Sequence, residues 1–146
     1  MRKLFMLGLI SLIGLVSVSG LSSDAANTLT GDNTLVSSGA NAGEGANAST
    51  GLVGVSSDGN LVTFISSATN LPDVSNYGYS KIYQKNLKTG ATARVDVSSS
   101  GVAADGTSYA VTVSENGRYV AFRSSAHNLI DGITIPKTGQ VYVRDT

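Results

Sequence analysis

The feature that most constrains the fold is a segment that occurs twice. Residues 55–71 read VSSDGNLVTFISSATNL, and residues 113–129 read VSENGRYVAFRSSAHNL, 58 positions later. Ten of the seventeen aligned positions are identical, and most of the others exchange similar residues, as Asp58 does with Asn116. Repetition at a fixed, long period is typical of folds in which copies of one structural unit stack on each other.

Each copy predicts a hairpin of two β-strands. An Asp-Gly dipeptide at 58–59 and an Asn-Gly dipeptide at 116–117 favour the positive φ angles of a two-residue turn. The segments on either side of these dipeptides alternate apolar and polar residues. We therefore expect first strands at residues 52–56 and 109–114, and second strands at residues 60–66 and 118–124. Phe64 and Phe122 occupy the same position of the second strand, so the same face should form the core in both copies.

A third strand follows in each copy after a loop of about 14 residues, as KIYQKN at 81–86 and as QVYVRD at 140–145. In the first copy, Lys-Thr-Gly at 88–90 predicts a turn into a fourth strand at 92–98. There Val95 and Val97 alternate with Arg94 and Asp96, as expected of an outer strand whose charges discourage pairing with another molecule. No apolar run has helical spacing, so the sequence predicts an all-β fold.

Four antiparallel strands that repeat at a long period predict the blades of a β-propeller. The segments VSENGRYVAFRSSAHNL…GQVYVRD and VSSDGNLVTFISSATNL…SKIYQKN resemble the repeats of TolB-like bacterial β-propeller proteins, over residues 51–146. The expected fold is therefore all-β, with four-stranded antiparallel blades of a β-propeller in an incomplete ring, and the resemblance implies an exported protein that binds a partner. The loops after residues 71 and 129 depart from the family because they lack its Gly-Asp-Thr-Asn run.

The first 26 residues are predicted to be a signal peptide. Arg2 and Lys3 precede an uncharged, mostly apolar run at 4–18, and small and polar residues follow, with cleavage expected between Ser19 and Ala26. The run is shorter than the roughly 20 residues that cross a bilayer as a helix. A retained membrane anchor is the alternative. The chain has no Cys, so lipid attachment is excluded, and the expected location is periplasmic or extracellular.

The rest of the chain divides at the repeat boundaries. Residues 27–50 are interpreted as a linker with a closing strand at 34–38, residues 51–108 as the first blade and its linker, and residues 109–146 as an incomplete second blade. The closing strand is expected because TLVSSGANAGEGANAST resembles RVDVSSSGVAADGTS of the first repeat. We expect it to pair with a third strand such as 140–145, or with the third strand of a missing final blade.

The number of blades leaves three arrangements open. A six-bladed ring at this period needs about 350 residues, whereas this sequence holds fewer than two complete blades. The sequence is then a fragment of a longer protein, one of several copies that self-associate into a ring, or a small open sandwich. The fragment is favoured, because stable repeat arrays usually need at least three units.

Composition excludes several classes of partner. Of the ten basic and ten acidic residues, Arg2, Lys3 and Asp24 precede residue 27, which leaves a net charge of about −1. This charge attracts neither nucleic acid nor, after signal cleavage, a membrane. The acidic residues are scattered and no Cys is present, so we expect no metal site and no cofactor.

Binding residues are expected on the long connections at 67–80, 99–108 and 125–139, which should all emerge at one end of the strands. The alternative is structural: Leu71 and Leu129 fill the blade edge, while the Asn before each of them bonds the loop backbone. The chemically interesting members of these loops are Asn70, Asp73, Tyr77, Tyr79, His127, Asn128, Asp131 and Lys137.

No residue is predicted to be catalytic. His127 is the only His, its counterpart in the first copy is Thr69, and no nucleophile motif accompanies it. Three functions remain open. The favoured one is a non-enzymatic exported scaffold that binds a protein, peptide or surface glycan. The others are the propeller part of a larger hydrolase or peptidase, and a structural protein of the cell surface or matrix.

Overall fold

The computed structural model describes residues 33–72, 78–136 and 138–146, and this part of the chain is all-β. The predicted signal peptide at 1–26 lies outside the described residues. Seven antiparallel strands form two sheets, and the described ranges contain no helix. They accordingly offer no helix of the length and apolarity that a bilayer crossing requires.

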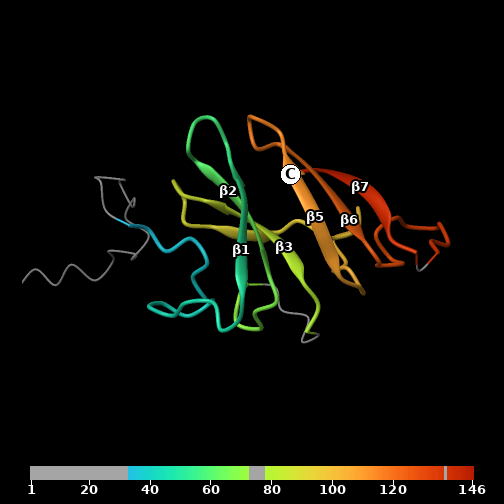
Figure 1. The fold of residues 1–146 in the computed structure, drawn as a ribbon, viewed down its shortest axis with the longest axis horizontal. Coiled ribbons are helices and arrows are strands. Elements are labelled where there is room, and N and C mark those ends of the chain that lie inside the picture. The colour runs from blue at the N-terminus through green and yellow to red at the C-terminus, as the bar shows by residue number, and fades with distance from the viewer. Residues whose placement is uncertain (1–32, 73–77, 137) are drawn as a thin grey trace, which may run out of the picture.

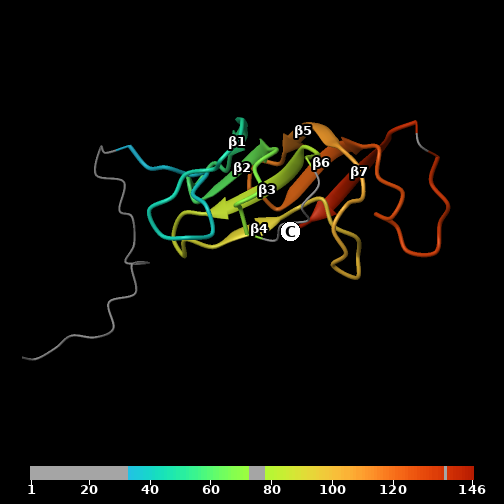
Figure 2. The ribbon, with the colours of Figure 1, turned by 90° about the horizontal axis from the view of Figure 1, so that it is seen from below.

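The two sheets correspond to the two sequence repeats and lie face to face along the long axis of the molecule (Figure 1, Figure 2). Sheet 1 has the order β1 (Thr50–Val55), β2 (Leu61–Ser66), β3 (Lys81–Asn86), β4 (Thr92–Arg94). Sheet 2 has the order β5 (Ser108–Val113), β6 (Tyr119–Ser124), β7 (Gln140–Asp145). β3 and β7 have the expected bounds, and β1, β2, β5 and β6 differ by one or two residues at their ends.

β4 is shorter than the strand expected at 92–98, because the side chain of Asp96 interrupts the ladder. Its carboxylate accepts hydrogen bonds from the main-chain N of Ile82 (3.2 Å) and from Ser108 Oγ (2.8 Å). Arg94 Nε also donates to Asp96, at 2.8 Å. A side chain thus takes the place of the main-chain acceptor that a longer β4 would offer to β3, and the chain turns away towards β5.

The hairpin turns are longer than the two-residue turns expected from their dipeptides. Ser56 N donates to Leu61 O, so residues 57–60 form the loop, and Gly59 N bonds back to Ser56 O at 2.8 Å. Only the glycine of the dipeptide has a positive φ, 70° at Gly59. Asp58 therefore supports the turn by accepting a hydrogen bond from Ser56 Oγ (2.6 Å) and does not adopt a left-handed conformation itself. Ser114 and Gly117 repeat this turn in sheet 2.

The main core lies between the two sheets. Val120 and Phe122 of β6 face Ile82 of β3, and all three side chains are buried. The ring of Phe122 stacks on that of Tyr142, with centroids 5.6 Å apart. The prediction that the Val-x-Phe face of the second strand forms core is confirmed here. The remaining buried members of this cluster are Val95, Ala104, Ala126 and Leu129.

A second, smaller core covers the opposite face of sheet 1. Phe64 stacks on Tyr83 with centroids 5.5 Å apart, as Phe122 does on Tyr142. Val36 and Ala46 pack on this cluster, so residues 33–49, here called the N-terminal cover, lie against the outer face of sheet 1 (Figure 1). The expected pairing of residues 34–38 with 140–145 is wrong within this chain, because Ser38 forms its bridge with Gly45 and the described pairing of β7 is with β6 alone.

Truncation of Phe122 tests the core between the sheets. Phe122→Ala should lower the free energy of unfolding by about 3–5 kcal/mol, because it removes a buried ring and leaves a cavity. Phe64→Ala should have a similar effect, because the N-terminal cover buries that ring to the same degree. Ile133→Ala, at a side chain that is 60% exposed, should stay within about 0.5 kcal/mol. If urea unfolding showed that all three variants lose an equally small amount of unfolding free energy, the face-to-face packing would be contradicted.

The first turn makes a prediction about pH. Hydrogen bonds from the Ser56 hydroxyl, and then from the Asn60 side chain and main chain, lower the pKa of Asp58 from 3.8 to about 2. Because the folded pKa lies below the unfolded one, Asp58 stabilises the fold above its ordinary pKa, and this contribution is lost as the pH falls towards 2. An NMR titration should find the Asp58 midpoint near 2. In Ser56→Ala the midpoint should move towards 3.8, whereas in Ser57→Ala it should not move.

Candidate binding surface at the loop end

The long connections gather at one end of both sheets, as the sequence predicts. Antiparallel strand order puts the turns at 56–60, 87–91 and 114–118 at the opposite end, where Ser57 N bonds Glu115 O across the two sheets. At the loop end, Ser108 N bonds Ser80 O, and Ser125 N bonds Thr107 O. The loops are therefore joined to each other by main-chain hydrogen bonds and form one surface.

Asn128 fastens the loop after β6 to the linker between the sheets. Its Oδ1 accepts from Asp105 N (3.1 Å), and its Nδ2 donates to Ala103 O (2.7 Å). In return, Asp105 Oδ1 accepts from His127 N at 2.7 Å. We call this reciprocal set of hydrogen bonds a clasp. It satisfies main-chain groups of two loops that have no strand partner at this point.

The same clasp occurs on sheet 1, with Asn70 and Asn47 in these roles. Asn70 Oδ1 accepts from Asn47 N (2.9 Å), Asn70 Nδ2 donates to Gly45 O (2.8 Å), and Asn47 Oδ1 accepts from Thr69 N (2.9 Å). Leu71 and Leu129, which follow the two Asn residues, are buried in the two cores. The structural interpretation of the Asn-Leu pairs is confirmed: the fold uses the polar atoms of Asn70 and Asn128.

His127 also contributes to the clasp. Its Nδ1 lies 3.2 Å from Asp105 Oδ2, and its Nε2 is buried with no hydrogen-bond partner among the described residues. Burial raises the pKa of the Asp105 carboxyl, but the hydrogen bonds from His127 outweigh it, so the pKa lies below its ordinary value. Sequence reasoning missed Asp105, although its alignment with Asn47 could have revealed it.

The other predicted site residues do not converge on one point. Tyr79 is exposed just before β3, and Asp131 is exposed and accepts a hydrogen bond from Ser100 Oγ at 3.3 Å. Asn70 belongs to the clasp of sheet 1, whereas His127 and Asn128 belong to that of sheet 2. Asp73, Tyr77 and Lys137 lie outside the described residues.

Two isoleucines form an exposed apolar part of the loop end that sequence reasoning missed. Ile130 and Ile133 are 41% and 60% exposed, and they lie on the loop from β6 to β7, which extends away from the sheets (Figure 2). Asp131 and Gly132 separate them. The sequence offered only a weak signal for them, because the same loop also contains Leu129 and Ile135, which are buried.

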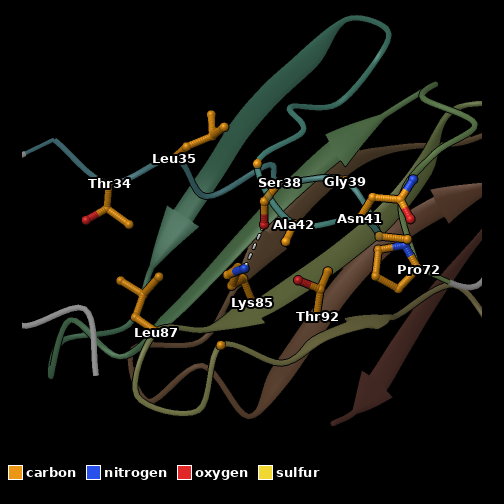
Figure 3. Close-up of a pocket in the computed structure, with 13 residues that line it drawn as sticks. Thr34, Leu35, Ser38, Gly39, Asn41, Ala42, Pro72, Lys85, Leu87 and Thr92 are labelled. Atoms are coloured by element: carbon orange, nitrogen blue, oxygen red, sulfur yellow. Dashed lines mark hydrogen bonds between the residues drawn. The ribbon is translucent and has the colours of Figure 1, made fainter. Parts of the chain in front are cut away.

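A groove lies between the N-terminal cover and the outer part of sheet 1 (Figure 3). Its volume is about 500 Å³, and Lys85 Nζ donates across it to Ser38 Oγ at 2.9 Å. Sequence reasoning missed this groove, because it treated residues 27–50 as a linker. The labelled residues around it are Thr34, Leu35, Ser38, Gly39, Asn41, Ala42, Pro72, Lys85, Leu87 and Thr92.

The buried charges near the loop end serve the fold. Arg94 and Asp96 form an ion pair inside the protein, and Arg94 also donates to Ala104 O at 3.2 Å. Lys81 Nζ donates to Ala68 O at 3.3 Å. Burial lowers the pKa of the Lys81 ammonium, the charge of Arg94 acts in the same direction, and Asp96 opposes them. The partners of these charged groups are the main chain and one another, so the charges hold the loops in place.

The described residues contain no group of three His, Cys, Asp or Glu side chains placed to hold a metal ion. No protein-family model, curated protein or solved structure matches the chain. Inferences about function therefore depend on the geometry of the two sheets and their loops.

Removal of Asn128 tests the clasp. Asn128→Ala should lower the free energy of unfolding by about 1–3 kcal/mol, because Asp105 N and Ala103 O lose their partner. Asn128→Asp keeps the acceptor and loses the donor, so it should lower the free energy of unfolding by an intermediate amount. The exposed Asp131 gives a control on the same loop, and Asp131→Ala should stay within about 0.5 kcal/mol. Chemical unfolding that cannot distinguish Asn128→Ala from the control would show that the clasp is dispensable.

Proposed function

We propose that the two sheets are neighbouring blades of a TolB-like β-propeller, and that the protein is an exported, non-enzymatic scaffold. Its ligand is a protein, a peptide or a surface glycan, which it binds at the loop end. The observation that carries the proposal is that one type of interface is built twice, once between the sheets and once between sheet 1 and the N-terminal cover.

The two interfaces agree residue by residue. Ser38 bridges to Gly45 as Val97 does to Ala103, and Ala46 N bonds Ser37 O as Ala104 N bonds Asp96 O. Val36 and Val95 then occupy the same place on the Phe64 and Phe122 clusters. The N-terminal cover therefore mimics the end of a preceding blade and its linker. Units that repeat the same contact with each neighbour are the basis of propeller architecture.

The arrangement of the strands supports the same proposal. β1 lies beside β5, while β4 lies on the far side of sheet 1 from β1 (Figure 1, Figure 2). In a propeller, the first strands of successive blades surround the axis and the last strands form the rim. The predicted signal peptide at 1–26 supports export. The use of His127 in a clasp supports a binding role without catalysis.

The loop end has the surface chemistry of a binding site for a macromolecule. The clasps make the base of the loops rigid, and Ile130 and Ile133 present apolar side chains beyond it. Asp131 lies next to them and is exposed. Apolar groups with polar neighbours on a rigid base are typical of surfaces that bind proteins or glycans.

A paired variant tests the loop end. The purified chain is screened against displayed peptides and against immobilised bacterial surface glycans. Ile130→Ser/Ile133→Ser should weaken the binding of any selected ligand by about tenfold or more, because it removes both apolar contacts. Val55→Ser changes an exposed apolar residue at the turn end and should leave binding unchanged. Ligands that bind both variants as tightly as the original chain would refute the assignment of this surface.

A further inference from the structure

The outer face of sheet 2, which points away from sheet 1, carries apolar residues without a cover. Val141 and Val143 of β7 are 76% and 68% exposed. They align with Ile82 and Gln84 of β3, both of which are buried against sheet 2. The outer face of sheet 2 thus corresponds to the face of sheet 1 that packs against sheet 2.

The edge of β7 is the counterpart of a paired edge. Thr146 N donates to the carbonyl O of Arg118, the residue before β6. Because main-chain groups alternate in direction along a strand, Tyr142 and Arg144 also direct theirs towards β6, whereas the N–H and C=O groups of Val141 and Val143 point to the open edge of the sheet. In sheet 1, the corresponding Ile82 O accepts from Val95 N at 2.8 Å. β7 therefore presents main-chain groups suited to a strand equivalent to β4 and its continuation.

The chain itself carries the complement of this face and this edge. The bridges of Ser38 and Val97 align residues 34–36 with residues 93–95, which lie along β3. In that alignment, Leu35 corresponds to Arg94, the residue opposite Tyr83, and so would lie opposite Tyr142. The described residues 33–37 belong to neither sheet, and the side chain of Leu35 is 61% exposed.

These complementary surfaces cannot meet within one molecule. The N-terminal cover lies at one end of the long axis, and β7 lies at the other (Figure 1). We propose that a second copy of this chain docks head to tail: the outer face of sheet 2 and the edge of β7 in one copy receive the N-terminal cover of the next. The interface is heterologous, so it generates a closed ring or an open chain of copies, according to the rotation at each contact.

The one charged side chain in the centre of the outer face is compatible with burial. Arg123 takes the position of Ile65, and its guanidinium lies over the ring of Tyr109, 5.5 Å from the centroid. It also donates to Thr138 O at 3.3 Å. Arg123 keeps both partners when a second copy covers the face, so docking buries no unpaired charge there. This inference uses the packing of the sheets and is independent of what the loop end binds.

The test compares two surface variants and a control by light scattering over a range of concentrations. Val141→Lys/Val143→Lys places charges on the outer face, and Leu35→Lys places one on the N-terminal cover. The aligned residue Arg94 pairs with Asp96, but Ser37 stands where Asp96 would be, so docking would bury the introduced ammonium without a partner. Val102→Lys is the control, because Val102 is 55% exposed on the linker and lies outside both docking surfaces.

The unchanged chain and the control should form assemblies of several copies, whereas each of the other variants alone should be a monomer. An equimolar mixture of the two variants should form a dimer, because one intact surface of each kind remains. Far-UV circular dichroism of each monomer checks that it is folded. Should a Lys variant be unfolded, Val141→Ser/Val143→Ser and Leu35→Ser replace the pair and should weaken assembly by about tenfold.

Two results would overturn the proposal. A monomeric unchanged chain at every concentration would show that the outer face does not accept a second copy. Assembly that is lost in Val141→Lys/Val143→Lys but retained in Leu35→Lys would show that two outer faces pack on each other in an isologous contact. In that case the mixture would yield no dimer of the two variants.

Discussion

A sheet with apolar side chains on both faces needs a cover on each side, and this requirement organises the whole protein. In sheet 1, Ile82 and Phe64 point to opposite faces, and both are buried. Sheet 2 covers one face and the N-terminal cover the other. Burial of such side chains supplies most of the stability of a fold that has no disulfide, and either cover alone would leave apolar surface in water. The linker and the N-terminal cover have the same geometry because they cover the same kind of face.

Polar groups determine where each sheet stops and the next begins. Asp96 ends β4, and it joins β3, through Ile82 N, to the first residue of β5. A buried carboxylate is costly unless it is paired, and here the guanidinium of Arg94, together with the donors of Ile82 and Ser108, compensates for its desolvation. The clasps of Asn70 and Asn128 then fix the loops relative to the linkers. The position of one sheet on the next follows from these bonds together with the apolar contacts.

This arrangement separates the residues that build the loop end from those that are free to contact another molecule. Asn70, Asn128 and His127 attracted attention in the sequence because they are polar and lie in loops. The side-chain amides of both Asn residues, and the main-chain N and Nδ1 of His127, are nevertheless hydrogen-bonded inside the fold. Ile130 and Ile133 instead expose a large part of their side chains to solvent. The same separation applies to sheet 2, whose inner face is core and whose outer face exposes Val141 and Val143.

Alternation and repetition along the chain were enough to predict all seven strands, their antiparallel order and the core face of the second strands, because these depend on neighbouring residues. The two Asn-Leu pairs could also be interpreted correctly from the sequence. The early end of β4 and the pairing of His127 with Asp105 depend on residues that meet only after folding. The N-terminal cover depends on such contacts too: the pattern of residues 34–38 predicts a strand, but only Ser38 forms a bridge there, with Gly45. The sequence by itself determined the strands and turns of the repeated sheet. The tertiary structure decided which face of each sheet is covered and by which segment, because burial depends on contacts between segments that are distant along the chain.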